Sequence, residues 1–349
     1  MDHRHIIVIG ASAGGIEAIK QLVSGLPRDL EASVFIVWHI SPDVKGILPD
    51  LLNALQVLPA AHALEGEPIR PGRIYVAPPD HHLIIEKDKV HITRGPRENR
   101  FRPAADPLFR SAAFAYGLHV IGVVLSGALD DGTAGLWAIK QCGGLAVIQD
   151  PQDAKVPSMP AKAAQAVKAD HILPANRMGG LLGRLVKEVL PSSYDNSTAA
   201  LSEINIAMQK DTFKRTTGEF KSGELTPYTC PECHGVLAKL QEGGHVRFRC
   251  HTGHAFSADA LLAAISETIE HALWNAIRNI RESVFFLNHM GDHFADANQP
   301  KLAAVYFKKA NEAELRAQMI LQAVHNHEYI NADMIGEEAR QTDSDNVNN

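Results

Sequence analysis

Short apolar segments alternate with helical patterns through residues 1–190, and this alternation restricts the fold more than any other feature. The apolar runs, rich in Val and Ile, are Ile6–Ile9, Val34–Val37, Ile74–Val76, Val120–Leu125, Leu145–Ile148 and Ile172–Leu173. The helical patterns are Ile16–Leu26, Pro107–Tyr116, Thr133–Gln141 and Leu181–Leu190. Such alternation is typical of a parallel sheet covered on both faces. We therefore expect an α/β domain with a doubly wound, mainly parallel sheet, made mixed at one edge by a hairpin at 83–93.

The chain changes character after Leu190. Residues 191–227 are polar and predict a linker, with a short helix around Leu201–Met208. Residues 228–256 hold three cysteines and predict a small separate unit. Residues 257–330 contain two amphipathic stretches and predict an α-helical hairpin with Ser257 as N-cap. Residues 331–349 are polar, and we expect a disordered tail.

Composition excludes several classes of protein. The 34 Lys and Arg against 40 Asp and Glu give a net charge of −6, so no general basic field favours nucleic acid. No apolar run approaches the ~20 residues that span a bilayer, and Ile6–Ile9 is too short for a signal peptide. Four cysteines in 349 residues do not make a disulfide scaffold. We expect a cytoplasmic protein with no nucleic-acid partner and no membrane insertion.

A glycine-rich turn follows the first apolar run. Gly10-Ala11-Ser12-Ala13-Gly14-Gly15 places Ser12 between a strand and a helix, where unpaired helix N–H groups stabilise negative charge. The spacing also fits the nucleophile-elbow pattern G-x-S-x-G. A glycine turn that packs or binds a phosphate is an equally good interpretation of this motif alone.

A serine needs a base and an orienting acid to become a nucleophile. His39 follows the second apolar run, and Asp130 and Asp131 follow the run that ends at Leu125. Functional groups gather where parallel strands end at their carboxyl edge. Taken singly, the histidine would satisfy a loop carbonyl and the acids would cap a helix. Together they predict a Ser-His-Asp site.

Several motifs resemble one family in the same order. They are the glycine turn, Trp38-His39-Ile40, Tyr75-Val76-Ala77-Pro78-Pro79-Asp80-His81-His82, Asn99-Arg100-Phe101-Arg102-Pro103 and Gly127-Ala128-Leu129-Asp130-Asp131-Gly132. Over residues 5 to 190 the chain resembles the catalytic domain of CheB-type chemotaxis protein-glutamate methylesterases. The resemblance implies a Rossmann-like α/β hydrolase, without a catalytic cofactor, that demethylates glutamate methyl esters on chemoreceptors and releases methanol. It also implies an ancillary glutamine deamidation.

The resemblance implies roles for three residues. Ser12 is the expected nucleophile, His39 the base and Asp131, directly before the glycine, the orienting acid. Ala13 and Leu129 stand where the family usually has threonine and glycine. The backbone near Ser12 and the 127–128 loop are expected to hold the oxyanion. Since the match begins at residue 5, we expect no receiver domain in this chain and hence no relief of inhibition through its phosphorylation.

A second pattern indicates a metal. Cys230-Pro231-Glu232-Cys233 and Cys250-His251-Thr252-Gly253-His254 give the spacing C-x2-C-x16-C-x3-H, close to that of structural zinc sites. We expect a zinc-ribbon-like unit in which Cys230, Cys233, Cys250 and His254 bind structural zinc; His251 and His234 are alternative fourth ligands. Unliganded cysteines or a disulfide are the competing interpretations.

Other functions compete with hydrolysis as interpretations of the sequence. A signalling adaptor, catalytically weak, would act in signal transduction through the zinc unit and the helical hairpin. A nucleic-acid-binding ribbon is disfavoured by the few aromatic residues and the negative charge. The expected partners are methylated cytoplasmic helices of chemoreceptors. Further candidate partners are a methyltransferase, a histidine kinase of the phosphorelay, and a second copy of the chain that docks through the hairpin. Arg100 and Arg102 either attract an acidic receptor helix or serve local contacts.

Overall fold

A computed structural model describes residues 5–40, 46–190, 224–242, 245–328, 330 and 334–335. The chain divides into two compact units, Met1–Leu261 and Leu262–Asn349. The expected short helix at 201–208, most of the linker and most of the tail lie outside the described residues. The domain boundaries placed within those segments therefore stay predictions.

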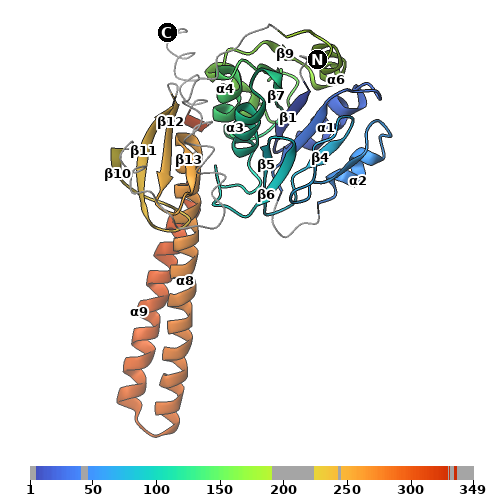
Figure 1. The fold of residues 1–349 in the computed structure, drawn as a ribbon. Helices are drawn as coiled ribbons and strands as arrows, with labels where there is room; N and C mark the ends of the chain where they lie inside the picture. The colour runs from blue at the N-terminus through green and yellow to red at the C-terminus, as the bar shows by residue number, and fades with distance from the viewer. Residues whose placement is uncertain are drawn as a thin grey trace, which may run out of the picture. The chain divides into compact units, whose positions relative to one another are not determined.

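The first unit is built on a parallel seven-stranded sheet with the order β3-β4-β2-β1-β7-β8-β9. Four of these strands, β1, β4, β7 and β9, are labelled in Figure 1. Its strands are β1 (Ile6–Ala11), β2 (Ser33–Trp38), β3 (Ala60–His62), β4 (Ile74–Val76), β7 (Val120–Val124), β8 (Leu145–Gln149) and β9 (His171–Leu173). Every pair in this sheet is parallel. Each of the six apolar runs coincides with a strand, although Leu125 lies just beyond the end of β7, and this confirms the α/β expectation. The short strand β3, Ala-Ala-His, carries no apolar run and was missed.

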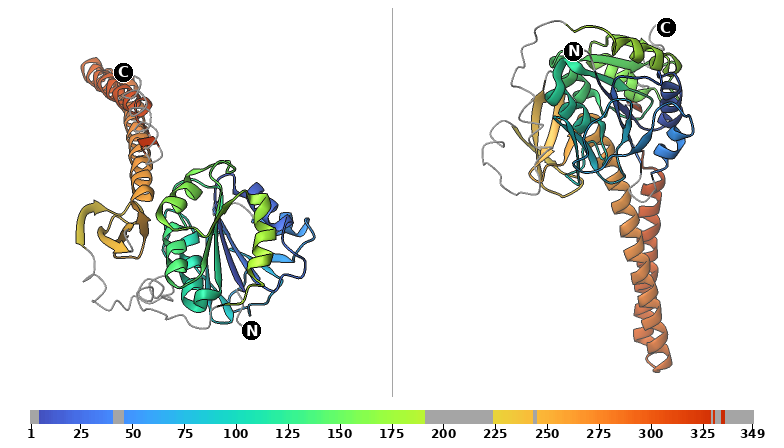
Figure 2. Two further views of the ribbon diagram at one scale, coloured as in Figure 1. Left: turned by 90° about the horizontal axis from the view of Figure 1, so that it is seen from above. Right: turned by 45° about the vertical axis from the view of Figure 1, so that its right-hand side comes forward.

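Helices cover both faces of this sheet (Figure 2). They are α1 (Gly15–Ser24), α2 (Leu48–Asn53), α3 (Ala105–Tyr116), α4 (Thr133–Gln141), α5 (Ser158–Ala166) and α6 (Ala175–Leu185), and a 3-10 turn spans Gly117–His119. Side chains of β1 alternate between two cores: Ile7 and Ile9 pack with α1 and α6, whereas Ile6 and Val8 pack with α3 and α4. Two-sided burial explains why β1 is apolar without alternation.

The expected hairpin exists but does not join the main sheet. Strands β5 (His82–Glu86) and β6 (Lys89–Thr93) pair antiparallel as a separate two-stranded sheet. The Ile85 N–H donates to the Ser111 hydroxyl of α3 at 3.0 Å, so the hairpin packs over that helix. The expectation of a mixed edge was wrong, because the apolar side chains of the hairpin are buried against α3 instead of extending the sheet.

A small antiparallel sheet, β10-β11-β12-β13, completes the first unit. Its strands are β10 (Glu224–Thr229), β11 (Val236–Glu242), β12 (His245–Cys250) and β13 (Ala255–Ser257). The sheet begins at Glu224, inside the segment 191–227 expected as linker. Pro227 and the polar residues of β10 gave no strand pattern, since this edge strand is mostly exposed.

The second unit is helical. Helix α8 (Ala258–Asp296) begins in the first unit, and α9 (Pro300–His325) returns beside it. Phe294 stacks on Tyr306 near the turn, while at the other end the His327 imidazole meets the Ser266 carbonyl. These contacts make an antiparallel hairpin, as expected. None of the helices in the described ranges is both long and apolar enough to cross a membrane.

Candidate active site and candidate metal site

Ser12 lies in the turn between β1, which ends at Ala11, and α1, which begins at Gly15. Its N–H donates to the Ser126 carbonyl at 3.0 Å, which ties the turn to the end of β7. Gly14 has φ 72°, and a Cβ there would approach atoms of Lys155 and Ser126 at 2.8 Å. Only glycine fits this left-handed, crowded position. The glycine motif therefore has a structural cause, and it leaves Ser12 at the strand-to-helix turn.

His39 is brought beside Ser12 by sheet pairing. It follows β2, the neighbour of β1, and its N–H donates to the Ala11 carbonyl at 3.0 Å. Its Nδ1 lies 3.1 Å from the Ser12 Oγ, and its Nε2 lies 2.7 Å from the Asp131 Oδ2. An ionised carboxylate only accepts, so Nε2 carries the proton and Nδ1 accepts from the serine hydroxyl. The two ring nitrogens thus exchange the roles they have in the chymotrypsin-type triad.

Asp131 is buried at the N-terminus of α3. Its Oδ2 accepts from the Ala105 N–H at 2.6 Å, and its Oδ1 accepts from the Asn99 amide at 2.9 Å. Burial alone would raise the pKa of Asp131, but the hydrogen bonds from His39, Ala105 and Asn99 lower it below its ordinary value. The carboxylate is therefore held charged and fixed in direction.

The adjacent acid points elsewhere. Asp130 accepts from the Ser257 hydroxyl at 2.6 Å, and burial raises its pKa to about 7. Of the two neighbouring acids, the structure thus brings Asp131 and not Asp130 to the histidine. Leu129 just before them has φ 62°, a left-handed conformation that favours glycine and that this chain holds with leucine.

Three further residues complete the site and were given no role from sequence. The Asn99 amide bridges Asp131 and Asp106, with 2.9 Å to each carboxylate. Burial, reinforced by the nearby Asp131 charge, raises the pKa of Asp106 to about 6. The Phe101 ring stacks on the His39 imidazole with centroids 3.8 Å apart. Asn99 and Phe101 lie in a motif that marked the family, but nothing in their residue types pointed to these contacts.

The structure bears on two expectations near the site, the position of the oxyanion donors and the role of Arg102. The Gly127 N–H donates to the Val156 carbonyl at 3.0 Å, so this part of the expected oxyanion loop is already engaged. Among the described residues, the Ala13 and Gly14 N–H groups show no protein acceptor. Arg102 pairs with Asp80 at 2.6 Å, which favours the local role over attraction of a partner.

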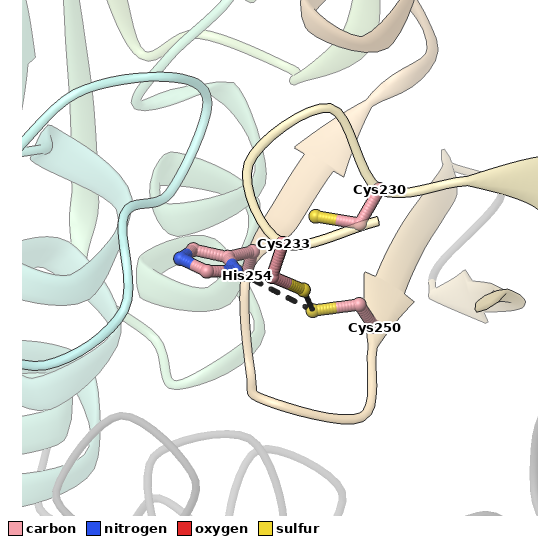
Figure 3. Close-up of side chains that lie close together, drawn as sticks. All are labelled: Cys230, Cys233, Cys250 and His254. Carbon is pink, nitrogen blue, oxygen red and sulfur yellow. Dashed lines mark hydrogen bonds between the residues drawn. The ribbon is translucent and has the colours of Figure 1, made fainter. Parts of the chain in front are cut away.

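The second site is a group of three cysteines and one histidine, here named the Cys/His group: Cys230, Cys233, Cys250 and His254 (Figure 3). One ligand atom from each lies within 4.8 Å of all the others. The first two cysteines flank the turn between β10 and β11, the third ends β12, and His254 precedes β13. The long-range pairing of β11 with β12 therefore brings the two halves of the motif together.

The donors of this group fit a closed zinc shell. Cys230 is fully buried and Cys250 nearly so, and all the cysteines are free thiols. Three sulfurs and one imidazole nitrogen match the four-coordinate donor sets of structural zinc. The alternative ligands His251 and His234 are exposed and stand outside the group.

Comparisons with known proteins find relatives over the first half of the chain. The family model for CheB methylesterase matches residues 7–182. A putative protein-glutamate methylesterase/protein-glutamine glutaminase of Leptospira interrogans is 43% identical over 180 residues, covering 51% of this chain and 93% of that protein.

Longer relatives match over a part of their length. A protein-glutamate methylesterase/protein-glutamine glutaminase 2 of Caulobacter vibrioides is 35% identical over 188 residues; the match spans 52% of this chain and 54% of that relative. The crystal structure of the Thermotoga maritima CheB methylesterase catalytic domain matches with a TM-score of 0.50 and 32% identity, covering 52% of this chain and 98% of that domain. The chain belongs to the CheB methylesterase family.

Proposed function

We propose that this protein is a protein-glutamate methylesterase, a serine hydrolase that removes methyl groups from glutamate methyl esters of chemoreceptors. The observation that carries the proposal is the hydrogen-bonded sequence Ser12 Oγ, His39 and Asp131, with distances of 3.1 Å and 2.7 Å. The names of the related proteins support the same substrate class. This intact arrangement also favours an enzyme over a catalytically weak adaptor.

The mechanism follows from the atoms in contact. His39 Nδ1 takes the Ser12 proton while Oγ attacks the ester carbonyl carbon. The protonated imidazole then gives that proton to the departing methoxide, and methanol leaves. Water attacks the acyl-enzyme with His39 again as base, which frees the glutamate carboxylate and restores the serine. Asp131 fixes the Nε2 tautomer and stabilises the imidazolium.

The oxyanion is proposed to lie at the turn before α1. The Ala13 and Gly14 N–H groups are the donors left there, and the N-terminus of α1 adds its partial positive charge. Deamidation of glutamine would use the same steps with ammonia as leaving group, which agrees with the second half of the relatives' names.

The Cys/His group is proposed to bind zinc as a structural ion. No ligand position stays open when four protein donors close the shell, so we assign the metal no step in hydrolysis. Bound zinc would supply folding energy to a sheet whose own core is small.

The second unit is proposed to serve docking. Phe285, Phe286 and Met319 expose 78%, 61% and 69% of their surfaces on the hairpin helices. The candidate partners are methylated receptor helices in the cytoplasm, a methyltransferase, a histidine kinase and a second copy of the chain.

Methanol release from a methylated receptor tests the function directly. The Ser12→Ala variant is expected to lose at least ~10³-fold in rate. Ser24→Ala, which removes an exposed hydroxyl at the end of α1, is the matched control and should match wild type. A Ser12→Ala protein with near wild-type activity would refute the proposal.

A further inference from the structure

One loop, residues 95–103, contacts both the active site and the small sheet. We propose that the small sheet positions the triad through this loop, with Asn99 as the positioning residue, so that metal loading of the Cys/His group sets the turnover rate. The inference rests on the proposed esterase function and the proposed zinc site. It concerns a coupling between them that neither site requires by itself.

The loop contacts two of the three triad residues. Asn99 donates to the Asp131 Oδ1 at 2.9 Å, and the Phe101 ring stacks on His39. Asn99 is only 2% exposed, so water cannot easily replace its amide. The orientation of both the acid and the base therefore depends on where this loop lies.

The small sheet holds the same loop through backbone pairing. The Ala255 N–H donates to the Arg97 carbonyl at 3.3 Å, and the Asn99 N–H donates to the Ala255 carbonyl at 2.8 Å. The loop thus pairs in parallel with β13 at its edge. In addition, the Ser257 N–H donates to the Asn99 Oδ1 at 3.0 Å, which fixes the amide that faces Asp131.

A buried charge network adds a second attachment. Glu98, 3% exposed, accepts from Arg110 of α3 at 2.6 Å and from Arg247 of β12 at 3.0 Å. Arg97 pairs at 3.3 Å with Glu232, which lies between the first two cysteines of the Cys/His group. The loop therefore contacts the first half of the metal motif through Glu232 and the strand that leads into the second half, β12, through Arg247.

The loop conformation needs this support. Asn99 and Arg100 have φ values of 49° and 75°, two consecutive left-handed residues without glycine. Such conformations persist where the surrounding structure enforces them. Zinc would fix Cys250 and His254 and hence the strand β13 that directly follows. Without the metal, β13 is held less firmly, and the loop can relax away from Asp131 and His39.

The test compares the wild-type chain with the Cys233→Ser variant. Cys142→Ser is the control, because Cys142 lies outside the Cys/His group. Bound zinc, kcat and KM for methanol release, and hydrogen exchange of residues 96–103 are measured together. We expect Cys233→Ser to lose zinc, to exchange faster at 96–103 and to lose about 10- to 100-fold in kcat with little change in KM. The control should resemble wild type in all readouts.

Asn99→Ala provides the second arm if Cys233→Ser does not fold. This variant should keep its zinc and still show the fall in kcat at unchanged KM. Zinc loss without change in kcat or in exchange at 96–103 would overturn the proposal, as would a wild-type protein that binds no zinc. If zinc loss speeds the exchange at 96–103 but wild type releases no methanol, the link between the metal site and the loop stands, and the proposed function fails instead.

Discussion

The two sites of the first unit are assembled in opposite ways. The active site joins side chains separated by 27 and 92 positions in the sequence, each delivered by the end of a parallel strand. The Cys/His group draws its ligands from residues 230–254 of one small sheet. The first therefore depends on a large apolar core being correctly folded. The second depends on local spacing within that sheet, and its donors suit a metal ion.

Burial shows the same difference. Strands β1 and β7 are buried along their whole length, so the backbone that carries Ser12 is rigidly supported. In the described part of the small sheet, β10 is exposed at most positions. The proposed reactive groups thus lie on the deeply buried sheet, whereas the sheet proposed to bind zinc carries an exposed edge strand.

The variant with the largest expected effect changes the proposed triad and leaves the Cys/His group intact. Asp131→Asn replaces the acceptor opposite Nε2 with a group that can donate, which favours the wrong imidazole tautomer. We expect methanol release to fall by about 10³- to 10⁴-fold with zinc content unchanged. Asp29→Asn, a change at an exposed acid, is the control. A loss below tenfold would show that Asp131 is not the orienting acid.

The next variant breaks the metal site. His254→Ala removes the one histidine of the Cys/His group, whereas His251→Ala removes an exposed neighbour. We expect His254→Ala to weaken zinc binding by more than the about 10- to 100-fold typical of an outer-shell partner. Titration with a chromogenic chelator measures the affinities. Equal affinities in the two variants would reassign the fourth ligand.

The smallest effect concerns pH and Asp130, which lies between the two sites. Burial raises the pKa of Asp130 from 3.8 to about 7, so the folded state keeps a proton that the unfolded chain has lost within that window. The contribution of Asp130 to the free energy of unfolding therefore decreases as pH rises from about 4 to about 7.

The Asp130→Asn variant removes this contribution. Urea unfolding at pH 4, 5.5 and 7 should show a smaller decrease with pH than in wild type, whereas Asp29→Asn keeps the wild-type dependence. Any remaining decrease is expected from Asp106, whose pKa is also raised by burial. An unchanged pH dependence in Asp130→Asn would contradict the burial that the structure gives this carboxyl group.

The parallel sheet was predictable because β1, β2 and β7 are continuous apolar runs, a pattern that two-sided burial imposes. The sequence predicts the hairpin at 82–93 but not its packing over α3. An apolar pattern indicates that one side of a strand is buried, but it does not identify the element that covers that side. Strand β10 was not predicted, because an exposed edge strand has no apolar pattern.

Some of the site residues could likewise be predicted from the sequence, and others could not. Ser12, His39 and Asp131 follow recognisable strands, and the cysteine spacing identifies a metal motif within one short segment. Asn99 was unpredictable in its role, because its contacts depend on a loop held from both sides by partners distant in sequence. The choice of Asp131 over Asp130 rested on a resemblance. In the structure Asp131 is the acid that contacts His39, and backbone N–H groups at the N-terminus of α3 donate to its carboxylate.

Covalent labelling tests most directly whether Ser12 is an activated nucleophile. The intact protein is treated with a fluorophosphonate, which reacts with activated serines, and the modified residue is located by peptide mass spectrometry. We predict one label per chain, on Ser12, with a rate that falls at least ~10²-fold in His39→Ala. Label on another serine, or an equal rate in His39→Ala, would contradict the account.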